Sequence, residues 1–228
     1  MKTKRISDGW LAVVFIAILL IVDQWIKITV KTSMCLGERL QITDWFYIYF
    51  IENRGMAFGI ELFSKLFLSL FRFAAIIIIG WYICRQIKQH ARTGYVMTLA
   101  MILAGAAGNL IDCMFYGMIF SGSSPYYVSY FVPFGTGYAP FMMGKVVDMF
   151  YFPLFSFDWP SWMPMVGGQE FVFFSPIFNF ADSCVTVGFF LLLIFFRREL
   201  NDLSLEFKKK DDKEGNTEKE NISSEYEE

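Results

Sequence analysis

The side chains best suited to chemistry are aspartates and asparagines that lie in or beside strongly apolar stretches of the chain. They are Asp23, Asn109, Asp112, Asp148, Asn179 and Asp182. Several carboxylates in one poorly hydrated layer cannot all ionise, because like charge and desolvation both raise a carboxyl pKa. Two aspartates that share a proton can activate water and polarise a carbonyl, as in aspartic proteases. Asp148 and Asp182 have no nearby basic residue except Lys145, so we expect them to be the catalytic pair.

The other polar residues also fit structural roles. Asp23 and Lys27 are four residues apart, so they lie on one helix face, and for this couple we favour an ion pair that holds the fold. Asp112 can cap or bridge at the end of a helix. Asn109 and Asn179 can join helices by hydrogen bonds, as amides do in membranes.

Residue counts exclude several other kinds of site. His90 is the single histidine, so a multi-histidine metal centre and a histidine-dependent protease are both excluded. The four cysteines form no CxxC pair, which removes zinc-ribbon and thioredoxin-like interpretations. The chain has no basic surface for nucleic acid. We therefore expect no cofactor, no metal and no nucleic-acid partner.

The composition is that of a membrane protein. Of 228 residues, 55% are hydrophobic and only 18% are charged, and the last 32 residues alone hold 18 charges (7 Lys/Arg and 11 Asp/Glu). A helix needs about 20 apolar residues to cross a bilayer. Four stretches satisfy this length, and they predict an all-α protein with four transmembrane helices at about 11–30, 66–84, 95–112 and 177–196.

Short basic segments set the expected orientation. Lysines and arginines gather at the N-terminus, after the second span and after the fourth, which predicts that both termini are cytoplasmic. The loops 31–65 and 113–176 then lie outside, and the loop 113–176 is rich in aromatic residues and turns. This topology places the polar residues of the first, third and fourth spans in one outer layer. We assign residues 1–200 to one membrane domain and 201–228 to a charged, disordered tail.

Five short motifs, in order and in register with the four spans, resemble the lipoprotein signal peptidase (signal peptidase II) family. They are VDQWIK (22–27), IENRGMAFG (51–59), AGAAGNLID (104–112), KVVDMF (145–150) and FNFADS (178–183). The resemblance implies a membrane aspartic endopeptidase of the bacterial cytoplasmic (inner) membrane. Such an enzyme cuts diacylglyceryl-modified prolipoproteins before the lipidated cysteine.

The resemblance also assigns roles to residues. It implies that Asp148 and Asp182 are the catalytic dyad near the outer leaflet, in a protein that we expect to be monomeric and in contact with membrane lipid. It further implies a small β-cradle on the outer face, formed around residues 40–58, and an outer loop that lies on the membrane. The residues expected to bind substrate or support the site are Asp23, Lys27, Asn53, Gly108, Asn109, Asp112, Asn179 and Ala181.

The sequence departs from the family pattern in two places. Cys113 stands where the family usually has an arginine that contacts the bound peptide, so that contact is lost or comes from another residue such as Lys145. Residues 121–143 form an insertion between Asp112 and Asp148, and we expect a lid or a membrane-lying loop there.

Two other classes of function remain open on the residues alone. A small transporter or channel component could use buried carboxylates for ion coupling, although four spans, no internal repeat and a single polar layer argue against it. A non-catalytic scaffold could use the same aspartates only to hold helices together.

Overall fold

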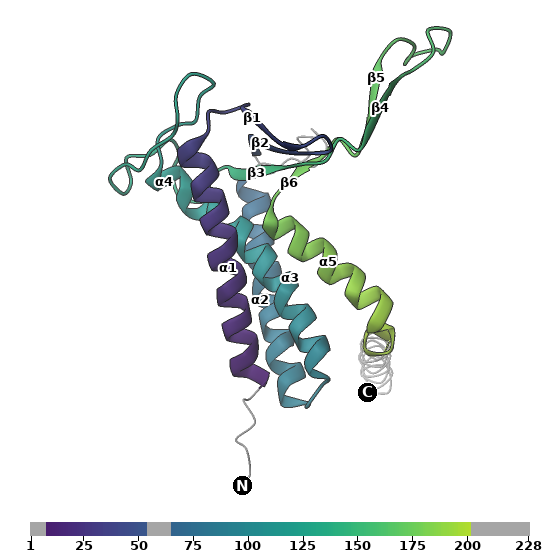
Figure 1. Ribbon diagram of the computed structural model, residues 1–228. Helices are drawn as coiled ribbons and strands as arrows, with labels where there is room; N and C mark the ends of the chain where they lie inside the picture. The colour runs from purple at the N-terminus through teal and green to yellow at the C-terminus, as the bar shows by residue number, and fades with distance from the viewer. Residues whose placement is uncertain (1–7, 54–64, 202–228) are drawn as a thin grey trace, which may run out of the picture.

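The helices form a bundle in the computed structural model, which describes residues 8–53 and 65–201. The long helices are α1 (Asp8–Ser33), α2 (Lys65–Lys88), α3 (Thr93–Ile111) and α5 (Phe180–Phe195). α3 contacts each of the other three. In Figure 1, α1, α2 and α3 run side by side, whereas α5 leaves the bundle at an angle.

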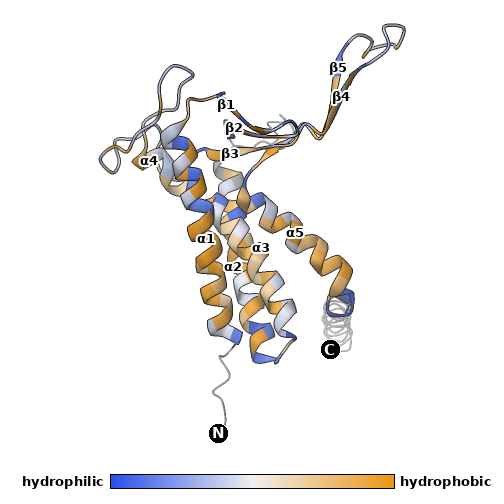
Figure 2. Ribbon diagram, in the orientation of Figure 1, coloured by the Kyte–Doolittle hydropathy of each residue, from blue (hydrophilic) through white to orange (hydrophobic). Residues whose placement is uncertain are grey.

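The outer surfaces of these helices are apolar, which suits contact with lipid. Ile21 and Trp25 of α1, Trp81 of α2 and Phe195 of α5 are all exposed. Figure 2 shows hydrophobic residues along most of the helices and hydrophilic residues at both ends of the bundle, including the end beside the sheet. Small residues allow close packing of α3 on α5, because a Cβ at Gly105 would meet the carbonyl oxygen of Ala181.

The prediction of four transmembrane helices is wrong. Among the residues that the structure describes, three helices are long and apolar enough to cross a membrane: Asp8–Ser33, Ser69–Lys88 and Thr93–Ile119. The fourth, α5, has 16 residues. At about 1.5 Å per residue it is about 24 Å long, less than the ~30 Å core of a bilayer. The shortfall arises because Ile177 and Phe178 form a strand and Asn179 caps the helix.

The third span is longer than predicted. α3 continues beyond residue 112 as a π-helix, η1 (Asp112–Tyr116), and then as the short helix α4 (Gly117–Ile119). A π-helical turn inside a helix often marks a functional position, because it re-aims side chains. Here it begins at one of the buried aspartates, Asp112.

The prediction of an all-α fold is also wrong, because two antiparallel sheets complete the molecule. The first has the order β1 (Arg39–Thr43), β2 (Phe46–Asn53), β3 (Val146–Tyr151) and β6 (Ile177–Phe178). The second is a hairpin of β4 (Phe155–Asp158) and β5 (Glu170–Phe173), which projects away from the bundle in Figure 1. Aromatic and β-branched residues dominate these segments and favour strands.

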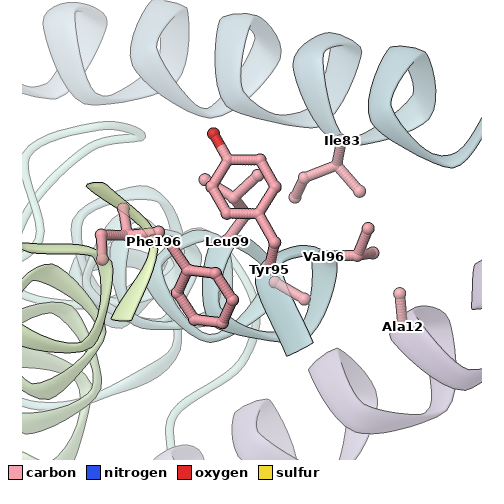
Figure 3. Close-up of a cluster of buried hydrophobic side chains, with 8 residues drawn as sticks. Ala12, Ile83, Tyr95, Val96, Leu99 and Phe196 are labelled. Atoms are coloured by element: carbon pink, nitrogen blue, oxygen red, sulfur yellow. The ribbon is translucent and has the colours of Figure 1, made fainter. Parts of the chain in front are cut away.

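Two apolar cores stabilise the two ends of the structure. The apolar cluster lies at the end far from the sheet and contains Ala12, Ile83, Tyr95, Val96, Leu99, Ala100, Leu192 and Phe196. Figure 3 shows Tyr95 and Phe196 between the helices. A second core joins the top of α1 and the π-helical segment to the sheet, with Val30, Met34, Phe50, Tyr116, Phe120, Val147 and Met149.

The insertion 121–143 folds back on the end of the third helical segment. Ser121 N–H donates to Tyr130 O, and Val132 N–H donates to Ile119 O. Within this fully described segment there is no helix, and a single β-bridge joins Phe120 to Phe131. The predicted tail lies outside the described residues apart from Asn201, as do residues 54–58 of the predicted cradle.

Candidate active site

The ten residues predicted for the site come from six elements that meet at the polar end of the bundle, under the first sheet. They are Asp23 and Lys27 of α1, Asn53 of β2, Gly108 and Asn109 of α3, Asp112 of η1, Asp148 of β3, and Asn179, Ala181 and Asp182 at the start of α5. The structure brings all of them into one connected group. Their roles stay a prediction.

Two asparagines connect Asp148 with Asp182. Asn179 Nδ2 donates to Asp148 Oδ1 over 2.6 Å and to Asn109 Oδ1 over 3.0 Å. Asn109 Nδ2 in turn donates to Asp182 Oδ1 over 2.7 Å. Because each amide has both a donor and an acceptor, the two carboxylates are held in a fixed relation through neutral groups.

The start of α5 orients Asp182. Asn179 is the N-cap residue, and its Oδ1 accepts from the Asp182 backbone N–H over 2.9 Å. Asp182 Oδ2 accepts from the Asn179 backbone N–H over 3.3 Å, which completes a capping box. One asparagine therefore both starts the helix and hydrogen-bonds the other aspartate, so helix formation and site assembly use the same residue.

Asp148 is buried on the central strand β3 and has an unusual acidity. Burial first, and then the charge of Asp182, raise the pKa of Asp148 to about 7. Hydrogen bonds from Asn179 and Asn53 and the charge of Lys27 act in the opposite direction. At neutral pH a substantial share of Asp148 is protonated, which is what a proton donor to a carbonyl oxygen requires.

Lys27 is the cation of the group and is fully buried. Its Nζ lies 3.0 Å from Asp23 Oδ2 and 2.9 Å from Asp112 Oδ2, and it donates to Asn109 Oδ1 over 2.8 Å. The favoured structural pair between Asp23 and Lys27 is therefore present. Its lysine also reaches the asparagine that holds Asp182, so this ion pair is part of the site's support.

Asp23 and Asp112 hold the elements that carry Asp182 and Asp148. Asp23 Oδ1 accepts from the backbone N–H of Ala181 over 3.0 Å, next to Asp182. Asp112 Oδ2 accepts from the backbone N–H of Val147 over 3.3 Å, next to Asp148. Gly108 makes the first contact possible, because a Cβ there would lie 2.5 Å from Asp23 Oδ2.

Sequence reasoning missed Gln24. Its Nε2 donates to Asp23 Oδ2 over 3.0 Å and to Asp112 Oδ1 over 2.9 Å, and its Oε1 accepts from Tyr116 Oη over 3.1 Å. An uncharged amide between Asp23 and Lys27 in an apolar span was the available signal.

A second omission concerns the position that departs from the family pattern. Arg72 of α2 donates from Nη1 to Cys113 Sγ over 3.4 Å, so a guanidinium does lie beside Cys113. Lys145, the expected substitute, instead lies 2.7 Å from Glu52.

Comparisons with known proteins identify the family of the chain. A family model described as signal peptidase (SPase) II matches residues 15–198. A lipoprotein signal peptidase of Porphyromonas gingivalis is 49% identical over 199 residues, covering 87% of this chain and 88% of that protein. A lipoprotein signal peptidase of Amoebophilus asiaticus is 33% identical over 181 residues, covering 76% and 72%.

The fold has a solved counterpart. A structure described as a bacterial membrane enzyme superposes with a TM-score of 0.53 at 23% identity and covers 84% of this chain and 90% of that one. This likeness supports the fold alone. The matched motif segments fall within the region that the family model covers, and the site joins them in space. The chain therefore belongs to the signal peptidase II family, whose members are aspartic-type peptidases.

Proposed function

We propose that this member of the family removes signal peptides with water activated between Asp148 and Asp182. The observation that carries the proposal is the hydrogen-bonded path from Asp148 through Asn179 and Asn109 to Asp182. It ties two carboxylates of unequal environment together at the polar end of the bundle. That is the arrangement that separates an acid from a base.

The unequal environments assign the two roles. Asp148, with its pKa near 7, is the proton donor. Asp182, which is half-buried and accepts N–H donors at both oxygens, is the base that takes a proton from water. The water oxygen bonds to the scissile carbonyl carbon while Asp148 protonates the carbonyl oxygen. Collapse of the gem-diol breaks the C–N bond, and the proton held by Asp182 passes to the leaving amine. One hydroxyl proton of the gem-diol returns to Asp148, so the product is a carboxylic acid and both aspartates regain their starting protonation states.

The substrates follow from the family and from the apolar surroundings of the site. Prolipoproteins are the substrate class, and we propose that the diacylglyceryl-modified cysteine stays in the bilayer during cleavage. Leaving the bilayer would cost about 0.8 kcal/mol per CH₂ group of its acyl chains. Both apolar parts of the substrate can approach sideways, past the exposed helix surfaces. The reaction proposed here uses side chains and water and calls for no cofactor.

We further propose a location and an organisation for the enzyme. Basic residues at the N-terminus and between α2 and α3 support a topology with the N-terminus in the cytoplasm of the bacterial cell and the site near the outer leaflet of the inner membrane. The family match over residues 15–198 supports a single peptidase domain over residues 1–200, and we expect this domain to act as a monomer.

The test compares Asp148→Asn and Asp182→Asn with Asp158→Asn, the same substitution at an exposed position of β4. Purified full-length protein is incubated with a diacylglyceryl-modified prolipoprotein, and cleavage is followed as a gel shift. We expect no turnover in the first two variants and normal turnover in the third.

Asp148→Asn keeps one carboxamide oxygen that can accept from Asn179. Asp182→Asn places an NH₂ group against one of two N–H donors, so it also loses a hydrogen bond. Turnover retained in Asp148→Asn would overturn the assignment. A scaffold role instead predicts a large loss of thermal stability in both variants and no proteolysis by the parent protein, and a transporter predicts ion flux in proteoliposomes.

A further inference from the structure

The two central strands of the first sheet present different side chains on their two faces. Asp148 is paired with Ile51, Val147 with Glu52 and Val146 with Asn53. Paired residues point to the same face and successive residues to opposite faces. Asp148 and Asn53 therefore share the face toward the site, whereas Glu52 and Val147 point to the opposite face.

On that opposite face, Glu52 is the centre of a buried ionic cluster, which we name the Glu52 cluster: Glu52, Lys31, Lys145 and Ser123. Glu52 Oε1 lies 2.5 Å from Lys31 Nζ and accepts from Ser123 Oγ over 2.8 Å. Glu52 Oε2 lies 2.7 Å from Lys145 Nζ. The side chain of Glu52 is 2% exposed and that of Lys31 is fully buried.

The electrostatics keep Glu52 ionised. Burial alone would raise the pKa of Glu52, but the charge of Lys31 and the hydrogen bonds from both lysines and Ser123 hold that pKa below its usual value. A buried carboxylate that has two cationic partners leaves both of them uncompensated when it is removed. The cluster is therefore costly to break at its centre and less so at its edge, where the Lys145 side chain is 25% exposed.

The cluster joins β2, which carries Glu52, to three other segments of the chain. Lys31 lies on α1, four residues after Lys27. Ser123 belongs to the insertion, and Lys145 directly precedes β3. Tyr138 of the insertion strengthens the junction: its ring lies 5.1 Å from Lys31 Nζ and 5.4 Å from Lys145 Nζ, and its Oη accepts from the Lys145 backbone N–H over 2.7 Å.

The pairing of β2 with β3 is irregular next to the site, so the contacts of the Glu52 cluster are needed to fix the two strands. The register between β2 and β3 shifts between Ile48 and Ile51, beside the pair of Ile51 with Asp148. A bulge bends a strand and weakens the ladder locally. Backbone pairing between β2 and β3 therefore fixes the position of Asp148 weakly. The contacts of Glu52 with Lys31 of α1 and with Lys145, directly before β3, add the constraint that holds both strands against α1.

We propose that Glu52 is a positioning residue. From the opposite face of the sheet, it fixes Asn53 and Asp148 by connecting β2, the start of β3 and the insertion 121–143 to α1. The inference rests on the proposed function, because it takes Asp148 as the group to be positioned. It gives the insertion a role as part of the support of the site, through Ser123 and Tyr138.

The test measures kcat and KM separately on monodisperse full-length protein, well below its melting midpoint, with a diacylglyceryl-modified prolipoprotein as substrate. Glu52→Gln keeps the shape of the side chain and removes its charge. We expect kcat to fall about 10- to 100-fold, as for a misplacement on the order of 1 Å, with KM within about twofold. Glu170→Gln, the same change on exposed β5, should leave both constants unchanged.

Two further variants separate positioning from simple stabilisation. Lys145→Met should lower kcat less than Glu52→Gln, because Lys145 lies at the edge of the cluster. Lys145→Arg, which keeps a cation next to Glu52, should restore most of kcat. Ser123→Ala removes one hydrogen bond of the insertion to Glu52 and should lower kcat only a few-fold. A purely structural role would lower the melting midpoint of these variants and leave kcat of the folded enzyme unchanged, which would overturn the inference.

Failure of this inference can be told apart from failure of the proposed function. If Asp148→Asn is inactive while Glu52→Gln keeps the parent kcat, the dyad stands and the positioning role is wrong. If Asp148→Asn turns over substrate, the dyad itself is wrong, whatever Glu52→Gln does.

Discussion

The helices α1, α3 and α5 contribute to two ends of the bundle, one with an apolar interior and one with a polar, charged interior. At one end, α1 supplies Ala12 and α3 supplies Tyr95 to the apolar cluster, together with the end of α5 (Figure 3). At the other end, α1 supplies Lys27 and α3 supplies Asn109 to a buried group of charges and amides. The apolar cluster packs mainly through apolar side-chain contacts. At the polar end, hydrogen bonds and ion pairs of defined length connect Asp23, Lys27, Asn109, Asp112, Asp148, Asn179 and Asp182.

The two ends therefore contribute differently to the stability and the activity of the protein. Apolar contacts tolerate volume-conserving changes and lose energy in proportion to the contact removed. Buried polar groups behave otherwise, because removal of one member leaves its partners unsatisfied. We therefore expect graded losses of stability at the apolar end and large, specific losses of activity at the polar end.

Lys27→Met should produce the largest effect, because it leaves Asp23 and Asp112 buried without their cation. Breaking a buried pair in this way costs about 3–5 kcal/mol of unfolding free energy, and we expect turnover to be lost as well. The control at the other end of the bundle is Arg92→Met, whose pair with Glu199 is 70% exposed on the arginine side and should contribute almost nothing. Equal melting midpoints for the two variants would contradict the comparison.

Asn179 tests whether the cap and the amide of one residue can be separated. Asn179→Ala loses both, so kcat should fall about 10²–10³-fold and stability by about 1 kcal/mol. Asn179→Ser keeps a capping oxygen but has no amide to donate to Asp148. It should therefore recover the melting midpoint and stay impaired in kcat. Recovery of both in the serine variant would show that only the cap matters.

The pH dependence should follow Asp148. If the protonated form is the acid, kcat/KM falls as pH rises through about 7, because the proton donor is lost. Asn53→Ala removes a hydrogen bond that lowers this pKa, so the pKa rises and the falling limb should move upward by roughly 0.5–1 pH unit. A limb that moves downward, or does not move, would contradict the assignment of Asp148 as the acid.

The smallest effects come from removing one hydroxyl at each end. Tyr95 Oη hydrogen-bonds Tyr82 Oη over 2.9 Å in the apolar cluster, and Tyr116 Oη donates to Gln24 at the polar end. Tyr95→Phe should lower stability by about 1 kcal/mol and leave kcat unchanged. Tyr116→Phe should lower kcat several-fold, because Gln24 holds Asp23 and Asp112. Equal kcat values in the two variants would remove the functional distinction between the ends.

Helices could be predicted where an apolar run had no competing structure. α1 contains the stretch predicted over 11–30, and α2 contains that over 66–84. α3 contains the stretch predicted over 95–112 apart from Asp112, which is the first residue of η1. The start of α5 could not be predicted, because Ile177 and Phe178 are equally apolar in a strand or in a helix. Their pairing with Tyr151 and Phe150 decided the outcome. A long-range contact of this kind leaves no trace in local composition.

The site was predictable as a set of residues but not as a set of contacts. Alternating helix directions indicated one polar layer, whereas the bond from Asn179 to Asp148 depends on how α5 is rotated. The same limit explains why Glu52 was missed. Its partners lie 21 and 93 positions away in the sequence, at Lys31 and Lys145.

The contact of Lys27 with Asp112 has a consequence for biogenesis. An ionisable side chain that enters the bilayer alone costs about 2.5–3.5 kcal/mol on scales from translocon insertion. α1 is synthesised first, and the ion pair of Asp23 with Lys27 leaves this helix without net charge at that level. It can therefore insert into the bilayer before the other helices. When α3 and η1 emerge later, Asp112 at the start of η1 meets a cation that is already in the membrane. Because of the order of the chain, Lys27 is in the membrane before Asp112, the carboxylate that it neutralises.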